Sequence, residues 1–213
     1  MSATPRRRRV PHGTVRQGRS FRAHPSHPQR VRATNRIGET TRMGTSVTIS
    51  AATDQDAEQI LKLQYLCYQQ EAALYDDYGI EPLTQTLAAL RAELGEGCVV
   101  VARLGEEVVG SVRGTVDADG TGRIAKLIVH PRMQRHGLGG RLLDAVEGRL
   151  VAERSATRYQ LVTGHRSEGN LRLYRGHGYL PVGTEQLTPR LSVITLEKEA
   201  PQPAGAGELV ART

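Results

Sequence analysis

Basic residues and glycines lie directly before an apolar, helix-like segment in the middle of the chain. Residues 129–146 read VHPRMQRHGLGGRLLDAV, with three glycines immediately after two arginines and a histidine. Glycine-rich turns at helix starts bind phosphates, because their free backbone N–H groups point outward and the helix dipole favours an anion. The segment therefore predicts a loop for a phosphate-bearing ligand.

Two common phosphate motifs do not fit this segment. A P-loop requires a Lys-Ser or Lys-Thr pair after its last glycine, and none follows here. A dinucleotide fingerprint requires G-x-G-x-x-G, but its last position is occupied by Leu142. What remains is residues 134–139, QRHGLG, which fit the pattern [QR]-x-x-G-x-[GA].

This pattern resembles the pyrophosphate loop of the GCN5-related N-acetyltransferases, the GNAT family. A β-branched strand ending in V-x-P precedes it, a G-R-L-L helix follows, and residues 173–183, LYRGHGYLPVG, resemble the second family signature, L-Y-x-x-x-G-[FY]-x-x-x-G. The resemblance extends from about residue 47 to residue 198 and implies acetyl-CoA as the co-substrate. The alternative is a plain helix start whose glycines allow close packing of strand and helix.

The resemblance also implies which residues contact the cofactor. They are the main chain at the end of the fourth strand, the glycine loop, and polar residues before the second signature: Leu127, Ile128, Val129, Gln134, Arg135, His136, Gly137, Leu138, Gly139, Gly140, Ser167 and Asn170. Ser167 stands where many family members carry an asparagine. Asn170, one helical turn before Tyr174, is a candidate to replace that asparagine.

Acetyl transfer to an amine requires a neutral amine, a polarised thioester carbonyl and a proton for the leaving thiolate. Tyr174 matches the general acid of the second signature; the alternative is a core tyrosine that holds the last helix on the sheet. The general base remains open. One branch of the family has a glutamate where this chain has Val162. His165 is a candidate by its ordinary pKa, and Glu71 or Asp76 could act through a water molecule.

The acceptor is expected to bind at the first two helices and the loop between them. Residues 68–85, YQQEAALYDDYGIEPLTQ, combine acids that attract a cationic amine with tyrosines that pack against its body. The predicted substrate residues are Tyr68, Glu71, Tyr75, Asp76 and Tyr78. A solvated, charged helix end is the alternative. Polyamines, amino acids, antibiotics and protein lysines all remain open, and no histidine or cysteine spacing predicts a metal site.

Charge is distributed very unevenly along the chain. Residues 1–42 contain eleven arginines and one acid, whereas residues 43–213 contain eighteen Lys and Arg against twenty-one Asp and Glu. We expect residues 1–42 to be a disordered basic tail, with translation starting at Met43, or an arm for nucleic acid. Nucleic-acid binding by the folded part is not expected. Residues 200–213 are predicted to be a disordered C-terminal tail.

The remaining pattern predicts an α+β domain over residues 43–199. Strands are expected at 46–52, 97–104, 107–116, 122–131, 158–164, 179–185 and 190–198, and helices at 53–75, 82–94, 137–154 and 168–175. This order favours a mixed, mostly antiparallel sheet of about seven strands with helices on both faces, not a doubly wound parallel sheet. The GNAT resemblance adds a splay between strands 4 and 5.

No apolar run is long enough for a membrane span and no secretory signal is present, so we expect a cytoplasmic protein. Cys67 and Cys98 are predicted to be buried small residues. The predicted function is an acyltransferase of the EC 2.3.1 type that moves acetyl to a primary amine of a small cationic acceptor, by direct attack in a ternary complex. The alternatives are a non-catalytic acyl-CoA-binding or regulatory module, and a protein-lysine acetyltransferase whose basic arm binds nucleic acid or ribosomes. A homodimer is compatible by analogy alone.

Overall fold

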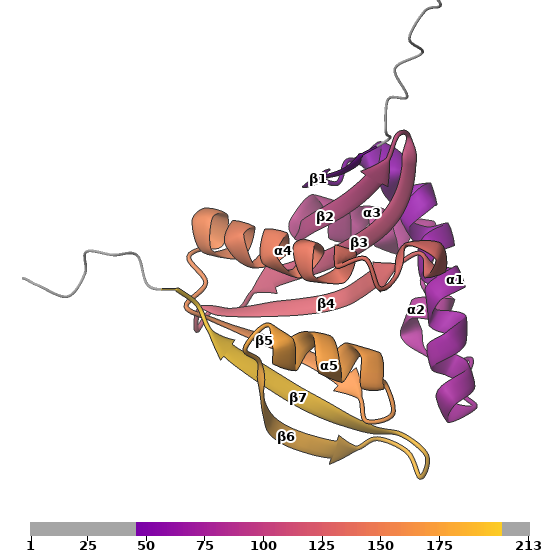
Figure 1. Ribbon diagram of the computed structural model, residues 1–213, viewed down its shortest axis with the longest axis vertical. Coiled ribbons are helices and arrows are strands. Elements are labelled where there is room, and N and C mark those ends of the chain that lie inside the picture. The colour runs from indigo at the N-terminus through magenta and orange to yellow at the C-terminus, as the bar shows by residue number, and fades with distance from the viewer. Residues whose placement is uncertain (1–45, 202–213) are drawn as a thin grey trace, which may run out of the picture. The chain divides into compact units, whose positions relative to one another are not determined.

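The computed structural model describes residues 46–201, which form one sheet with helices on both of its faces (Figure 1). The predictions for residues 1–42 and for residues 202–213 lie outside the described residues. The strands are β1 (Val47–Ala51), β2 (Cys98–Leu104), β3 (Glu107–Val116), β4 (Thr121–Val129), β5 (Arg158–Gly164), β6 (Leu180–Gln186) and β7 (Ser192–Glu199). The helices are α1 (Ala57–Tyr75), α2 (Glu81–Thr84), α3 (Leu87–Glu96), α4 (Leu138–Arg154) and α5 (Glu168–Gly176), with 3-10 turns η1 (Asp54–Asp56) and η2 (Pro131–Met133).

The sheet has the strand order β1-β2-β3-β4-β5-β7-β6, and every neighbouring pair is antiparallel except β4 with β5. The predicted mixed, mostly antiparallel α+β sheet is therefore confirmed. The parallel pair arises because α4 crosses from the end of β4 back to the start of β5, as such connections require.

Both faces of the first half of the sheet are buried, which explains the unbroken apolar run CVVVA in β2. Its residues alternate between two hydrophobic clusters: Cys98, Val100 and Ala102 face α4, whereas Val99 and Val101 face α1 and α3. A strand covered on both faces needs no polar alternation. The α4 cluster also receives side chains from α5, β5 and β7, so it joins the two halves of the molecule.

Strands β4 and β5 separate soon after they start, as the resemblance predicts. They pair in register from Thr121 with Arg158 to Ile124 with Leu161, and the last residues of both strands have no partner across the gap. A β-bulge lies where β4 leaves β5. Arg113 of β3 pairs with Ala125 and Ser111 pairs with Ile128, so two residues of β4 oppose one of β3, and Lys126 takes a φ of 52°. Bulges bend a strand and redirect its side chains.

A buried polar cluster holds the paired end of the splay together. The hydroxyl of Tyr179 donates to Glu147 Oε1 (2.8 Å), Lys198 Nζ lies 2.6 Å from Glu147 Oε2, and the Tyr159 hydroxyl donates to the Glu147 carbonyl (3.0 Å). Burial and the neighbouring Glu147 carboxylate raise the pKa of Tyr159 to about 12. Each polar atom of Glu147 has a partner, so this cluster ties α4 to β5 and β7 without reaching the gap.

Three details differ from the sequence analysis. The single helix predicted over residues 82–94 is wrong: Gln85 is extended (φ −61°, ψ 133°), so α2 ends before it and α3 starts anew behind the N-cap Thr86. The prediction of burial holds for Cys98, whereas Cys67 is only half-buried. Ala200, assigned to the C-terminal tail, is buried, and its N–H donates to the Thr157 carbonyl (3.0 Å).

None of the helices in residues 46–201 combines the length and the apolar character that crossing a membrane would require.

Candidate active site

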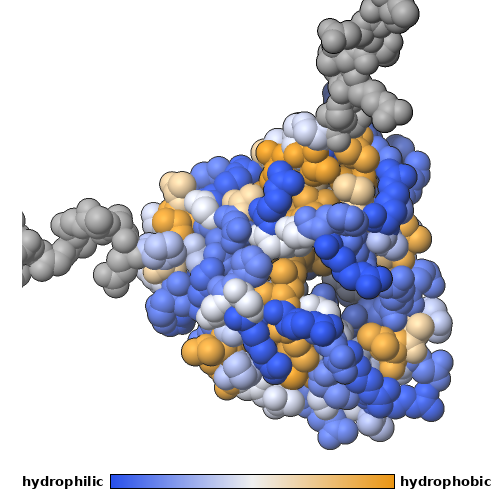
Figure 2. Space-filling model, viewed as in Figure 1, coloured by the Kyte–Doolittle hydropathy of each residue, from blue (hydrophilic) through white to orange (hydrophobic). Residues whose placement is uncertain are grey.

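A large open cavity of about 1170 Å³ occupies the gap between β4 and β5. Figure 2 shows the surface hollowed between the part that carries α4 and the part that carries α5, with hydrophilic side chains on both rims. One end is lined by the end of β4, the loop before α4, the start of α4 and α5; we call it the loop end. The other end is lined by α1, α2, the end of β5 and the start of β7; we call it the acceptor end.

The loop end offers unpaired backbone donors. Gly137 is the N-cap of α4 with φ 74°, a left-handed conformation that favours glycine, and no atom lies within 4 Å of where its Cβ would be. Within the described residues, the backbone N–H groups of Arg135, His136 and Gly137 make no hydrogen bond. The first N–H groups of α4 likewise have no intrahelical acceptor. This arrangement is a cradle for an anion.

The other two glycines of the loop have a different role. A Cβ on Gly140 would lie 2.7 Å from the ring of His177, and one on Gly139 would lie 3.2 Å from Leu173. They let α4 approach the end of α5 closely, so their packing role is between two helices, whereas the alternative explanation expected packing of a strand against a helix. The loop therefore combines one glycine that shapes the anion cradle with two that bring α5 alongside it.

The end of β4 presents main-chain groups to the cavity. Leu127, Ile128 and Val129 line it, as the resemblance predicts, and their outer edge has no strand partner. Two side chains already use the Val129 carbonyl: Gln134 Nε2 donates to it at 3.0 Å, and Cys67 Sγ lies 3.5 Å from it. Burial raises the pKa of the Cys67 thiol to about 11.

Tyr174 is buried in α5 and lines the cavity. Its ring lies 6.0 Å from that of Tyr179, yet the two hydroxyls differ: Tyr179 donates to Glu147, whereas no group in residues 46–201 hydrogen-bonds the Tyr174 hydroxyl. Burial, reinforced by the Glu71 carboxylate, raises the pKa of Tyr174 well above its usual range. The phenol therefore stays protonated and is available as a proton donor.

Glu71 of α1 faces the same space from the acceptor end. Its Oε1 accepts a hydrogen bond from Ser167, while Oε2 accepts none within the described residues. Its charge contributes to the raised pKa of both Tyr174 and Tyr68, after the larger effect of burial. Glu71 thus lies near both phenols with one carboxylate oxygen available to a ligand.

The last turn of α1 is hydrogen-bonded to the turn between β5 and α5. The backbone N–H of Arg166 donates to the Tyr75 hydroxyl (2.8 Å), and the Arg166 guanidinium donates to the Leu74 carbonyl (3.0 Å). Gly164 makes this approach feasible, because a Cβ there would collide with the Tyr75 hydroxyl. Tyr75 and Arg166 thus form part of the wall of the acceptor end, and the Tyr75 hydroxyl already accepts a hydrogen bond.

Most predicted site residues are brought together. Those that line the cavity are Leu127, Ile128, Val129, Gln134, Arg135, Gly137, Leu138, Gly139, Gly140, Ser167, Asn170, Tyr174, Tyr68, Glu71 and Tyr75. The Asn170 amide lies 3.4 Å from the Thr163 hydroxyl, at the start of α5.

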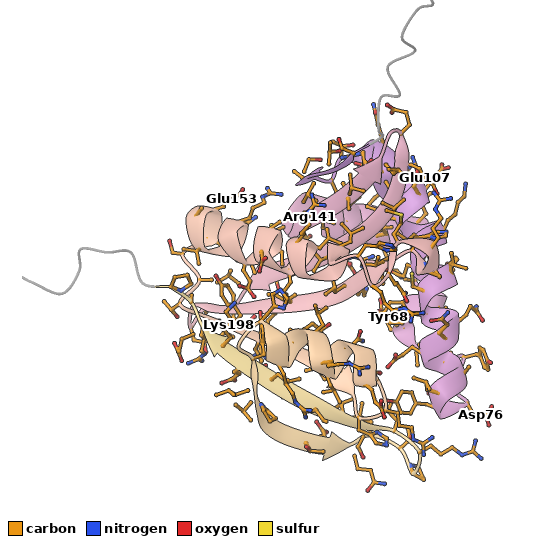
Figure 3. The ribbon with its side chains drawn as sticks, in the orientation of Figure 1. Tyr68, Asp76, Glu107, Arg141, Glu153 and Lys198 are labelled. Atoms are coloured by element: carbon orange, nitrogen blue, oxygen red, sulfur yellow. The ribbon has the colours of Figure 1, made fainter. Side chains whose placement is uncertain are left out.

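Four predicted residues lie elsewhere: His136, His165, Asp76 and Tyr78 do not line the cavity. His165 Nδ1 is held by the backbone of Ser192, 2.9 Å from its carbonyl and 3.1 Å from its nitrogen. Asp76 ends α1 in a left-handed conformation and pairs with Arg190. In Figure 3, Tyr68 lies on the side of α1 toward the sheet, whereas Asp76 lies at the far end of the helix.

Sequence reasoning missed a polar cluster behind the acceptor end. Lys126, on the β4 bulge, lines the cavity and pairs with Glu81 (2.9 Å) and Glu93 (3.3 Å). Glu93 also pairs with buried Arg113, whose Nη1 lies 3.1 Å from Gln85 Oε1. The positive φ of Lys126 and the extended Gln85 could not be seen in the sequence, because both are set by tertiary contacts.

Within residues 46–201, no three His, Cys, Asp or Glu side chains come together in a way that could hold a metal ion.

Comparison with known families gives one match. Residues 57–179 match the acetyltransferase (GNAT) family, which is more than half of the chain. No curated protein matches the sequence.

Solved structures show the same fold at low sequence identity. A GNAT-family acetyltransferase from Streptococcus pneumoniae is 19% identical, with a TM-score of 0.59 over 72% of this chain and 99% of that one. The PaiA N-acetyltransferase of Thermoplasma acidophilum, in complex with coenzyme A, is 14% identical, with a TM-score of 0.60 over 72% and 99%. YncA of Salmonella typhimurium, with its cofactor acetyl-CoA, is 18% identical, with a TM-score of 0.59 over 77% and 99%.

Proposed function

This chain belongs to the GNAT family of acetyltransferases, and from that membership we propose that it transfers acetyl from acetyl-CoA to the primary amine of a small cationic acceptor, by direct attack in a ternary complex. The observation that carries the proposal is the cavity itself. It joins an anion cradle at the loop end to a protonated phenol on α5, Tyr174, and to a carboxylate at the acceptor end, Glu71.

The loop end suits a pyrophosphate. Its unpaired N–H groups around Gly137 and the N-terminus of the 17-residue helix α4 supply donors and a favourable dipole. Of the four basic side chains that line the cavity, Arg135 lies in this loop and Arg172 lies in α5. The structures of PaiA and YncA are described with coenzyme A and acetyl-CoA, which supports the same ligand here. Acetyl-CoA would supply the activated acetyl group and the thiol leaving group.

The proton transfers are assigned to two cavity-lining side chains, Glu71 of α1 and Tyr174 of α5. The amine must lose a proton before its nitrogen attacks the thioester carbon, and Glu71 is placed to accept that proton directly or through water. An unpaired main-chain N–H on the splayed part of β4 would stabilise the developing oxyanion. As the C–N bond forms and the C–S bond breaks, Tyr174 donates its proton to the departing sulfur. His165, which faces the Ser192 backbone, has no part in this assignment.

Amine-dependent release of coenzyme A tests the proposal. The full chain is supplied with acetyl-CoA and a panel of primary amines, and the free thiol is followed with a chromogenic thiol reagent. Release that requires an amine, with formation of the N-acetyl product, supports the proposal. Coenzyme A binding without release on any amine would contradict it and favour a non-catalytic acyl-CoA-binding module.

A further inference from the structure

The three tyrosines of α1 differ in what their hydroxyls already bind. Tyr65 donates to the Gln85 carbonyl (2.7 Å), and Tyr75 accepts from the Arg166 N–H (2.8 Å). Among the described residues, no group hydrogen-bonds the Tyr68 hydroxyl, and the side-chain polar atoms that are sealed from solvent without a partner both belong to β3. The Tyr68 hydroxyl is therefore open to the cavity that this residue lines.

Tyr68 lies close to both groups to which the proposed reaction assigns proton transfers. Glu71 follows it by three residues on α1, and residues with this spacing are neighbours on the surface of a helix. Burial raises the pKa of Tyr68 well above its usual range, and the neighbouring Tyr174 and Glu71 add to that rise. Other polar groups line the cavity, among them exposed Glu168 at the start of α5, but Glu168 does not contribute to this rise. Tyr68 thus places a neutral hydroxyl near the carboxylate and the proton donor.

The nitrogen that attacks the thioester needs hydrogen-bond acceptors as well as a base. A neutral primary amine has one lone pair and two N–H groups, and the lone pair must point at the thioester carbon for the C–N bond to form. Both N–H groups then need acceptors, because a buried donor without a partner costs about 1–3 kcal/mol. Glu71 Oε2 is available to one of them, and the Tyr68 oxygen is available to the other.

We propose, as a refinement of the proposed function on which it rests, that Tyr68 orients the acceptor nitrogen by accepting one of its N–H groups while Glu71 accepts the other, and that this pair selects primary amines over N-methylated ones. A neutral secondary amine has a single N–H. A hydrogen bond to a charged acceptor is about twice as strong as one to a neutral acceptor, so Glu71 keeps that N–H and the methyl group faces Tyr68. The Tyr68 hydroxyl then loses its partner, which disfavours the methylated amine.

Matched pairs of amines test this assignment. With the full chain and saturating acetyl-CoA, kcat/KM for coenzyme A release is measured for butylamine, histamine, tyramine, Nα-acetyl-lysine amide and 1,4-diaminobutane, each beside the derivative that carries one methyl group on every primary amine nitrogen. The unaltered protein is expected to prefer the primary amine by about tenfold or more. In Tyr68→Phe, kcat/KM for the primary amine should fall about tenfold, whereas that for the methylated amine should change little. The preference should therefore nearly vanish.

Tyr65→Phe is the matched control on the same helix. Tyr65 lies three residues before Tyr68, and its hydroxyl is also hydrogen-bonding, but it does not line the cavity. Its substitution should leave the preference for primary amines unchanged. Coenzyme A affinity, measured by calorimetric titration, should be the same in both variants, because neither residue belongs to the loop end.

The outcomes separate this inference from the proposed function. An unchanged preference in Tyr68→Phe, or an equal loss of preference in Tyr65→Phe, would overturn the role of Tyr68 and leave the acetyltransferase standing. Equal or faster turnover of the methylated amines by the unaltered protein would also overturn it. Absence of release with every amine would contradict the proposed function, and the inference would fall with it.

Discussion

The two ends of the cavity are built in different ways. The loop end is made largely from main chain: the unpaired N–H groups around Gly137 and the open edge of β4. The acceptor end is made from side chains of α1, α2, β5 and β7. Among the acids of residues 68–85, Glu71 is the one that lines the cavity. A main-chain site depends on local conformation and can be encoded in six consecutive residues. A side-chain site depends on which faces of distant segments meet.

This difference explains what the sequence could and could not predict. Short motifs with fixed spacing predict that the glycine loop, the end of the strand before it and Tyr174 share one site, and all of these predicted residues except His136 line the cavity. The sequence predicts Asp76 and Tyr78 in the site because residues 68–85 combine acids with tyrosines. The left-handed cap at Asp76 ends α1, however, and the chain beyond turns its acids away from the cavity.

The break between α2 and α3 was missed for a similar reason. Residues 82–94 have helical composition, but the side chain of Gln85 is drawn into the buried cluster with Gln64 and Arg113. Those hydrogen bonds satisfy buried polar groups only if the backbone at Gln85 is extended. The splay between β4 and β5 is predicted only by the family resemblance, since no residue pattern within either strand indicates where their pairing stops.

A negative charge placed in the anion cradle should have the largest effect, and this effect should be on the binding of coenzyme A at the loop end. In Gly137→Asp, a carboxylate about 5 Å from a phosphate charge costs about 3 kcal/mol at an effective dielectric constant of about 20, which lowers coenzyme A affinity on the order of a hundredfold. Asp is among the residues that tolerate the φ of 74° at this position. Calorimetric titration with coenzyme A measures the loss.

Gly148→Asp is the control for that variant. Gly148 is an exposed glycine in the same helix with no atom near the position of a Cβ, and its substitution should leave the affinity unchanged. Full affinity in Gly137→Asp would remove the loop from the binding site.

The next largest effect is expected from Tyr174→Phe. Loss of a general acid should lower kcat by about a hundredfold while coenzyme A affinity stays the same. Since burial raises the pKa of Tyr174, its phenol stays protonated as the pH rises through 10. The kcat of the unaltered protein should therefore not fall on the alkaline side of its pH profile up to that pH. An unchanged kcat in Tyr174→Phe, with the chemical step shown to be rate-limiting by single-turnover kinetics, would exclude it as the acid.

Tyr179→Phe provides the matched structural case. This neighbouring tyrosine is buried and donates to Glu147, so its substitution should cost about 1–3 kcal/mol of unfolding free energy. The turnover of the folded enzyme should not change, because the Tyr179 hydroxyl does not reach the cavity. Denaturant unfolding and steady-state kinetics on the same preparation distinguish the two tyrosines.

At the acceptor end, Glu71→Gln should raise KM for the amine by about tenfold or more, since hydrogen bonds to a charged group contribute about 1.5–3 kcal/mol. Coenzyme A affinity should be unaffected. Asp76→Asn removes a charge from the same helix end but outside the cavity, and KM should stay the same. If Asp76→Asn raised KM as much as Glu71→Gln, the acceptor end would extend beyond the cavity walls.

The smallest effect concerns Cys67, which touches Val129 between the two ends. Its pKa of about 11, against an ordinary 9.0, lowers the thiolate fraction at pH 8 about a hundredfold. The greater nucleophilicity of a high-pKa thiolate recovers about tenfold, so alkylation should be about tenfold slower than for a free thiol. The rate should keep rising up to pH 11, and coenzyme A should protect. Mass spectrometry of iodoacetamide-treated protein tests this; rapid labelling at pH 8 would contradict it.

The central claim is that the gap between β4 and β5 holds the cofactor by its main chain. Hydrogen exchange of the full chain, with and without coenzyme A, tests it most directly. The account predicts that coenzyme A slows exchange of the amides at the end of β4 and in residues 135–140, which have no strand or helix partner for their outward groups. Binding that leaves these amides unprotected, with slower exchange only elsewhere, would contradict the account.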